Sequence, residues 1–316
     1  RSLQADTMPR YCSNVLIIVL VLTLSCIFFV LAMSFKNTVL PVQTTLKSKG
    51  RLLDISQPVV MGILNATPDS FYNKGRDSDT DSLLHKAERM LNDGAAILDI
   101  GGATTKPGAQ LISADEELQR VIPVIEGIIK RFPDAWLSAD TYNAAVAKEA
   151  VMAGVSIIND VSSGSIDKDM LSTVAALQVP YIAMHMQGTP ETMQQNPQYN
   201  SVALDILHYL RDVCADCHNA GITDIIIDPG FGFGKTLEHN YELLGNMHTL
   251  HMLGKPILAG ISRKGMIWKA LNTTPESALN GTTALHVIAV QQGANILRVH
   301  DVKEAKEVIT LIGMMR

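Results

Sequence analysis

Eight short apolar stretches, rich in β-branched residues, recur along the chain, and each stops at or beside a polar residue. They read VVMGILN, AILDIGG, WLSADT, SIINDV, YIAMHM, DIIIDP, PILAGISRK and NILRVHD. Short, wholly apolar strands that alternate with amphipathic helices are typical of a parallel sheet covered on both faces. Eight such units predict a single (β/α)8 barrel, the TIM-barrel fold, whose active site lies where the strands end.

Segments with helical spacing separate these strands. Thr80 can cap a helix that runs to about Asn92, and Ser113 and Glu116 have the spacing of a capping box ahead of the next helix. Pro275 is suited to the first turn of a later helix. The other predicted helices span residues 143–153, 167–178, 201–219, 238–253, 275–292 and 303–314.

The polar residues at the strand ends are expected to share one mouth of the barrel, because all the strands run in parallel. Two loops at this mouth, residues 66–79 and 103–112, are long and polar, which favours lids or binding loops. The strand-end residues able to do chemistry are Asn65, Asp99, Asp140, Asn159, His185, Asp228, Lys264, Arg298 and His300.

The first 46 residues differ in character from the rest, so we divide the chain into an N-terminal extension, 1–46, and a barrel, 47–316. The segment 15–35 contains 21 residues without a charge, long enough to span a bilayer. Most flanking basic residues follow it, which predicts a cytoplasmic barrel with a possible inner-membrane tether. Alternatively, Met33 is the natural start and the upstream residues are not part of the protein.

Composition and charge limit the class of ligand. Hydrophobic residues make up 47% of the chain, enough for a large core, and the formal net charge is -5. No basic stretch is long enough to follow a nucleic-acid backbone, so we expect no nucleic-acid partner. Small anionic ligands need only a few local cations and remain compatible with this charge.

Two familiar motifs are present only in part. A nucleotide-binding P-loop would need a glycine at Pro229, five residues before Gly234-Lys235-Thr236. The stretch from Cys214 to His218 resembles a haem attachment motif, but its surroundings have the apolar spacing of a helix. We interpret the glycine-rich segment after Asp228 as a loop that lets the backbone and Phe233 approach a flat ligand.

A carboxylate and amide trio suggests recognition of a heterocycle. Asp140, Asn159 and Asp228 end separate strands, and such side chains can form paired hydrogen bonds with an amino-substituted ring. The alternative is that they are turn and capping residues, since Asp and Asn are common at strand ends.

Cations gather after the last two strands. Arg263, Lys264, Arg298 and His300 can form the phosphate site that these barrels often carry there, with solvated loop residues as the alternative. Asn65, on the neighbouring first strand, can join them or bind a hard metal ion. We interpret His185 as a pocket-wall residue, and Asp99 as a support for the second long loop.

Eight stretches taken together resemble one family, dihydropteroate synthase, from about Val59 to the C-terminus. None is decisive alone, but eight in register, one for each strand, are highly specific. They are GILNATPDSF, DIGGATTKPG, SADT, INDVSSG, MHMQGTP, DPGFGFGKT, GISRKG and RVHDV.

The resemblance implies condensation of (7,8-dihydropterin-6-yl)methyl diphosphate with 4-aminobenzoate, release of diphosphate, and Mg²⁺ as cofactor. It assigns pterin binding to seven residues: Asp140, Asn159, Met184, Asp228, Phe233, Gly260 and Lys264. It assigns the diphosphate to Asn65, Arg298 and His300, with Asn65 also a metal ligand. It assigns 4-aminobenzoate to Phe71, Thr105, Lys106, Pro107 and Ser262. The catalytic residues that it implies are Asp140, Lys264 and Asp69.

The sequence departs from the family pattern at two informative positions. Lys106 stands where most members have arginine, which keeps the charge but loses the planar fork, so Lys106→Arg should preserve or improve turnover. Gly265 replaces a serine often found there. By the same resemblance we expect a homodimer packed through outer helices near the C-terminus, and sulfonamides as competitive inhibitors.

Two other functions fit part of the pattern. A pterin-binding methyltransferase would share the Asp140, Asn159 and Asp228 trio but would not need the cations after the last two strands. A membrane-tethered module that binds a pterin without catalysis would fit the apolar segment and the altered Lys106. The complete set of diphosphate residues favours the synthase over both.

Overall fold

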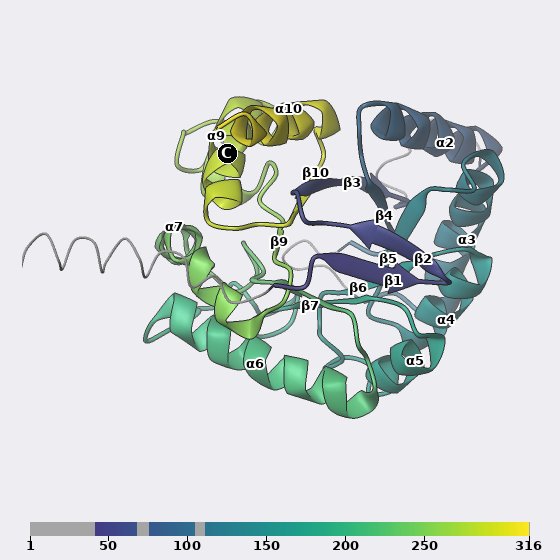
Figure 1. The fold of residues 1–316 in the computed structure, drawn as a ribbon, viewed down its shortest axis with the longest axis horizontal. Coiled ribbons are helices and arrows are strands. Elements are labelled where there is room, and N and C mark those ends of the chain that lie inside the picture. Colours follow the sequence, from purple (N-terminus) through teal and green to yellow (C-terminus); the bar gives the residue numbers. More distant parts are fainter. Residues whose placement is uncertain (1–41, 68–75, 105–110, 316) are drawn as a thin grey trace, which may run out of the picture. The chain divides into compact units, whose positions relative to one another are not determined.

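Eight parallel strands form the barrel that the sequence predicts, and helices surround it (Figure 1). The computed structural model describes residues 42–67, 76–104 and 111–315, so the apolar segment 15–35 lies outside it. The barrel strands are β3 Val59–Asn65, β4 Ile97–Gly101, β5 Trp136–Asp140, β6 Ile157–Asp160, β7 Tyr181–Met184, β8 Ile225–Asp228, β9 Leu258–Ala259 and β10 Ile296–Val299. Neighbours pair in chain order, and β10 pairs with β3. A parallel bridge between Ile227 and Ile257 joins β8 to β9 and closes the ring.

The helices follow the predicted spacing, with four differences. The helices are α2 Arg76–Asn92, α3 Ala114–Arg131, α4 Ala144–Ala153, α5 Met170–Leu177, α6 Val202–Ala220, α7 Leu237–Gly245, α8 Gly265–Trp268, α9 Leu279–Gln291 and α10 Val302–Gly313. Thr80 was wrongly predicted to cap the first helix, because it lies inside α2, and the short helix α8 was not predicted. The predicted helix 238–253 is divided, because α7 ends at Gly245 and a 3-10 helix, Met247–Leu253, follows. Pro275 was wrongly placed in a first turn. It precedes α9, and its carbonyl accepts a hydrogen bond from Arg263.

An antiparallel hairpin, which the sequence pattern did not reveal, precedes the barrel. It consists of β1 Thr45–Ser48 and β2 Arg51–Asp54. Leu46 and Ile55 are fully buried against the first inward-facing layer of the barrel strands. The compact unit therefore begins at Val42 and not at Lys47, because residues before Lys47 contribute to the hairpin and its contacts.

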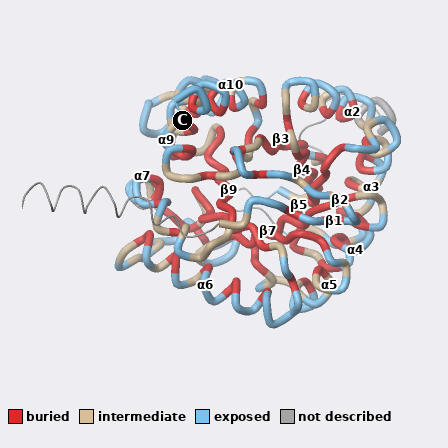
Figure 2. The backbone as a smooth tube through the Cα atoms, in the orientation of Figure 1, coloured by how far each residue is buried: buried red, intermediate tan, exposed pale blue. Residues whose placement is uncertain are grey.

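The period of two in a strand determines which side chains enter the barrel. One layer of inward side chains is wholly apolar: Met61, Ile97, Trp136, Ile157, Ile182, Ile226, Leu258 and Ile296. Two residues further along each strand come positions on the same face, among them Asp99, Asn159, Met184, Asp228, Gly260 and Arg298. Figure 2 shows that buried residues concentrate on the strands and on the inner sides of the helices. The candidate site residues thus lie directly above an apolar floor.

The partial motif at Cys214 and Cys217 is part of an ordinary helix. Both thiols are free and buried on α6. Burial raises the pKa of Cys214 to about 11 and that of Cys217 to about 12, so both are unreactive thiols at neutral pH. In the described ranges, no helix is long and apolar enough to cross a membrane.

Candidate active site

An arginine between two carboxylates forms the centre of the mouth. Arg298 on β10 donates from Nε to Asp99 Oδ2 at 2.6 Å and from Nη2 to Asp140 Oδ2 at 2.5 Å. Asn159 on β6 donates to the same Asp99 oxygen at 3.1 Å. Four strands are thereby joined by one network, in which the Asp99 side chain is fully buried.

The surroundings of Asp140 place the pKa of its carboxyl group near neutral pH. Burial raises the pKa of Asp140 to about 7, although Arg298 acts in the opposite direction, and Asp99 adds to the rise. For Arg298, burial lowers the pKa, but the two carboxylates more than offset this and hold it above its usual value. A carboxyl group that titrates near neutral pH in a cleft is a candidate for chemistry.

Asp228 and Lys264 face each other across a glycine. A Cβ atom added to Gly260 would lie 3.7 Å from Lys264 Nζ and 3.8 Å from Asp228 Oδ2. Burial raises the pKa of Asp228, while Lys264 and the Gly230 N–H, which donates to Oδ1 at 2.7 Å, oppose the rise. Burial lowers the pKa of Lys264 to about 8, against the attraction of Asp228. Lys264 is therefore still largely protonated at neutral pH. Gly260, which has no side chain, leaves space beside the Asp228 carboxylate and the Lys264 ammonium.

An apolar cluster lies beside these charges. Met184, Tyr142 and Val161 pack together, and Phe233 packs against them. Lys264 Nζ lies 4.7 Å from the centre of the Phe233 ring, a cation–π distance. A flat ligand can thus meet apolar side chains on its faces and acids or amides at its edge.

His300 and Ser262 form a separate polar pair. His300 Nδ1 lies 3.1 Å from Ser262 Oγ, and the His300 N–H donates to the same oxygen at 3.2 Å. Although His300 is exposed at the mouth, desolvation of its ring, together with the nearby cations Arg298 and Lys86, lowers its pKa to about 4. His300 is therefore neutral at pH 7 and can contribute a hydrogen bond but not a charge.

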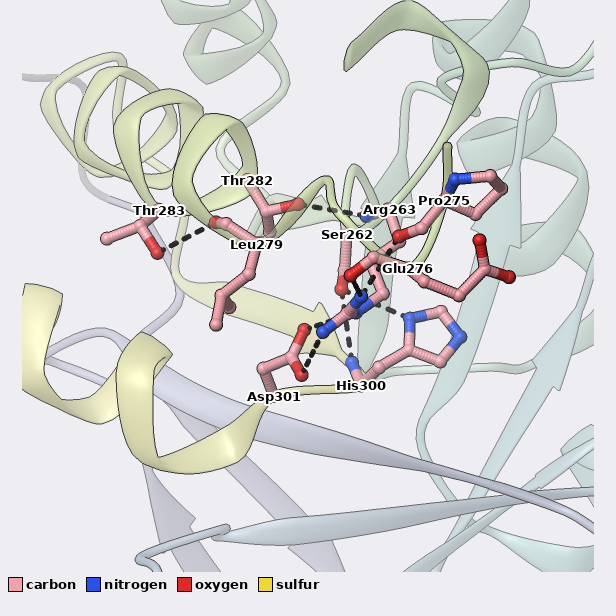
Figure 3. Close-up of polar contacts among 9 residues, drawn as sticks. All are labelled: Ser262, Arg263, Pro275, Glu276, Leu279, Thr282, Thr283, His300 and Asp301. Carbon is pink, nitrogen blue, oxygen red and sulfur yellow. Dashed lines mark hydrogen bonds and ion pairs between the residues drawn. The ribbon is translucent and has the colours of Figure 1, made fainter. Parts of the chain in front are cut away.

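Arg263 was wrongly grouped with the phosphate-binding cations. Figure 3 shows that its guanidinium is held by Asp301 and by the carbonyls of Pro275 and Glu276. Its Nε and Nη2 donate to the two oxygens of Asp301 at 2.8 and 2.9 Å. The bidentate pair joins the loop after β9 to the start of α10, and the bonds to the two carbonyls join it to the segment before α9, so Arg263 supports the loop that carries Lys264.

Asn65 is exposed at the end of β3, opposite Gly101 of β4. Its amide oxygen is a suitable ligand for a hard cation, which prefers oxygen donors. Among the described residues, no cluster of three or more His, Cys, Asp or Glu side chains could hold a metal. The predicted aminobenzoate residues Phe71, Thr105, Lys106 and Pro107, and also Asp69, lie outside the described residues.

Two strand-end residues make contacts that their interpretation did not include. Asp99 points into the barrel, where it accepts hydrogen bonds from Arg298 and Asn159. Residues 105–110 of the second long loop, which it was interpreted to support, lie outside the described residues. His185 is not a pocket-wall residue. It follows the inward Met184, so it lies on the outer side of β7, where it packs edge-to-face with Tyr209 at 4.8 Å and bonds Lys235.

Lys235 is a site residue that sequence reasoning missed. In the sequence it belongs only to an incomplete P-loop motif, yet it is 3% exposed and its amino group contacts three polar atoms behind the pocket. A lysine this deeply buried is rare. The close spacing of glycines just before it was the signal available in the sequence.

The fold is an α/β barrel, and its mouth places acids and an amide suited to a polar heterocycle beside cations suited to an anion. Consistent with this, the family model described as "Pterin binding enzyme" matches residues 61–300. The chain therefore belongs to the pterin binding enzyme family.

Individual relatives agree with this membership. The dihydropteroate synthase of Escherichia coli (strain K12) is 46% identical over 84% of this chain and 94% of its own length. A crystal structure of Yersinia pestis dihydropteroate synthase in a sulfonamide drug complex has a TM-score of 0.81 and 45% identity, covering 86% of this chain and 99% of that one. The structure of Xanthomonas albilineans dihydropteroate synthase with 4-aminobenzoic acid has a TM-score of 0.81 and 39% identity, covering 87% of this chain and 98% of that one.

Proposed function

We propose that this chain is a dihydropteroate synthase. It condenses (7,8-dihydropterin-6-yl)methyl diphosphate with 4-aminobenzoate and releases 7,8-dihydropteroate and diphosphate. The observation that carries the proposal is the layer of inward strand-end residues. There, acids and an amide suited to a heterocycle lie beside Lys264 and Arg298, which are suited to an anion.

The pterin is proposed to lie against Asp140, Asn159 and Asp228. Carboxylate and amide oxygens that face ring N–H and amino groups give strong discrimination in a pocket with little water. Met184 and Phe233 would contact the faces of the ring. The space at Gly260 would bring the ring edge within reach of Lys264.

The diphosphate is proposed to bind beside the pterin, where β9, β10 and β3 end. Arg298 supplies charge there, His300 supplies a neutral hydrogen-bond donor, and Ser262 orients His300. Mg²⁺ fits this arrangement, because it is commonly held by one or two protein oxygens together with substrate phosphates, and Asn65 offers an exposed amide oxygen. When bound, Mg²⁺ would neutralise charge on the leaving diphosphate.

The chemistry requires no covalent enzyme intermediate. Departure of diphosphate breaks the carbon–oxygen bond and leaves a pterin cation, which the Asp140 carboxylate can stabilise electrostatically. The arylamine of 4-aminobenzoate then attacks that carbon and loses a proton. We propose that the loops with Asp69, Phe71, Thr105, Lys106 and Pro107 cover the aminobenzoate and exclude water.

The decisive experiment measures diphosphate release by the purified chain. We expect release only when dihydropterin diphosphate, 4-aminobenzoate and Mg²⁺ are all present, and a sulfonamide should compete with 4-aminobenzoate. Binding of the pterin without turnover would instead identify a non-catalytic pterin-binding protein.

We also propose a homodimer. Large apolar side chains are exposed on the segments near the C-terminus: Leu271, Ile288, Leu311, Met314 and Met315. Two of the helices that carry them, α9 and α10, pack against each other, and exposed apolar side chains that gather on neighbouring helices are typical of a protein interface. Light scattering of the purified chain tests this proposal.

Pterin affinity should depend on pH. The proposed binding form of Asp140 is the carboxylate, and burial has raised its pKa to about 7. Below that pH the free site holds a proton that must leave on binding, so affinity should fall as pH falls from 8 to 6. Calorimetry with a pterin that lacks diphosphate avoids titration of the diphosphate group, and should detect proton release below pH 7. Equal affinity at pH 6 and pH 8 would contradict an ionised Asp140 in the complex.

A further inference from the structure

The loop after β8 is held by its carbonyl groups. Five consecutive carbonyl oxygens, from Gly230 to Gly234, each accept a hydrogen bond from a side chain. The donors, in order, are Lys235 at 2.8 Å, Lys264 at 2.5 Å, Gln194 at 2.7 Å, Lys235 at 3.0 Å and Tyr199 at 2.7 Å. Lys235 is the donor at two of these five positions.

The Lys235 amino group makes three hydrogen bonds. It donates to the carbonyls of Gly230 and Phe233, and Nζ lies 2.9 Å from His185 Nδ1. Burial lowers the pKa of Lys235 well below its usual value and lowers the pKa of His185 to about 2, so the imidazole is neutral. Both protonation states of Lys235 satisfy the contact with His185, because the ammonium donates to Nδ1 and the neutral amine accepts from the Nδ1–H tautomer.

The loop also lies very close to the segment that follows β7. Gly230 has φ +68°, and a Cβ there would collide with the carbonyl oxygen of His185. A Cβ at Gly234, with φ +61°, would lie 2.6 Å from the Gln187 oxygen. The Lys235–His185 hydrogen bond joins the same two segments, so the Lys235 amino group and the glycines together determine the position of the loop.

This loop carries groups that face the mouth. The Gly230 N–H donates to Asp228 Oδ1, and Phe233 stacks beneath the Lys264 ammonium. Lys235 donates hydrogen bonds to the carbonyls of both Gly230 and Phe233, so it is connected to both of these residues. A shift of the loop would move both the carboxylate and the ring.

We propose that Lys235 is a positioning residue for the heterocycle, which acts through the carbonyls of Gly230 and Phe233 and through His185. The inference rests on the proposed function, because it assumes that the pocket beside Asp228 and Phe233 holds the pterin. It adds that recognition depends on a buried lysine that does not touch the ligand. The 4-aminobenzoate subsite, formed by other loops, should not depend on it.

The test replaces Lys235 with methionine, which keeps most of the volume and removes the amino group together with its three hydrogen bonds. We expect KM for dihydropterin diphosphate to rise about 10–100-fold, since small displacements of binding groups have effects of this size. KM for 4-aminobenzoate should change less than about twofold. A merely structural residue would lower the melting temperature without separating the two KM values.

A matched control is Tyr181→Phe, which removes a buried hydrogen bond from Tyr181 to Asp160 at 2.8 Å on the outer side of β7. It should reduce stability and leave both KM values unchanged. His185→Leu provides a second variant if Lys235→Met does not fold. It should raise the pterin KM in the same direction, and its effect should not add to that of Lys235→Met.

Three outcomes are distinguishable. If the wild-type chain neither binds nor converts the dihydropterin, the proposed function fails. If the wild-type chain is active but Lys235→Met and His185→Leu leave the pterin KM unchanged, or raise both KM values equally, the positioning inference is overturned. A selective rise in pterin KM supports it.

Discussion

Replacing Arg298 with methionine is expected to abolish turnover and to lower the free energy of unfolding by about 3–5 kcal/mol. The stability loss arises because the fully buried Asp99 would lose the cation that binds it at 2.6 Å. The Asn159 amide would be its one remaining hydrogen-bond donor among the described residues, where Asp99 Oδ1 already has no partner. The activity loss arises because the same guanidinium holds Asp140 and supplies charge for the proposed diphosphate site.

Urea denaturation at pH 7.5 and the diphosphate-release assay measure these two effects. Arg131→Met is the matched control, because Arg131 pairs with Asp81 at 3.2 Å with both side chains largely exposed. Such surface pairs contribute about 0–1 kcal/mol. The double variant Asp99→Asn/Arg298→Met should recover part of the stability but none of the turnover. A loss below about 1 kcal/mol in Arg298→Met would show that Asp99 does not depend on this cation.

Replacing Asp228 with asparagine is expected to weaken pterin binding about 100-fold, while the fold is kept. The asparagine oxygen can still accept from the Gly230 N–H, which Asp228 Oδ1 now does at 2.7 Å. Its amide NH2 group, however, would face the N–H groups of the heterocycle, and two donors cannot form a hydrogen bond. The substitution also removes the negative charge that strengthens these hydrogen bonds. Mismatches of this kind in buried polar sites carry large penalties in affinity.

Calorimetric titration with a dihydropterin measures the affinity of this variant directly. Asp160→Asn is the matched control, since Asp160 is also a buried strand-end acid but bonds Ser162, Gly164 and Tyr181, away from the mouth. It should change stability and leave pterin affinity intact. Unchanged affinity in Asp228→Asn would remove Asp228 from the pterin site.

Much of the fold follows from local patterns in the sequence. The eight apolar stretches are the eight barrel strands, and the predicted barrel is confirmed. Ser113 caps α3 as its spacing indicates, with Oγ accepting from the Glu116 N–H. The hairpin before the barrel was missed, because two four-residue strands that place few side chains in the core have too short a pattern to recognise.

The candidate site could be predicted only in outline. Asp140, Asn159 and Asp228 do end strands of one barrel, and their proposed contacts with the pterin stay a prediction. Arg263 shows the limit of such reasoning, because it is adjacent to Lys264 yet turns away to bind Asp301. Its φ of +54° and the helix that follows determine that direction, and neither is evident from residue type.

The sequence by itself determined which residues can lie at the mouth, because strand, helix and turn preferences act over a few neighbouring positions. Only the tertiary structure decided which of them meet. Asp99 and Arg298 are 199 residues apart and become partners only when the ring of strands closes. Lys235 becomes part of the site only when two glycines let one loop lie against another. Such partnerships depend on strand register and close packing, which join distant segments and leave no local pattern in the sequence.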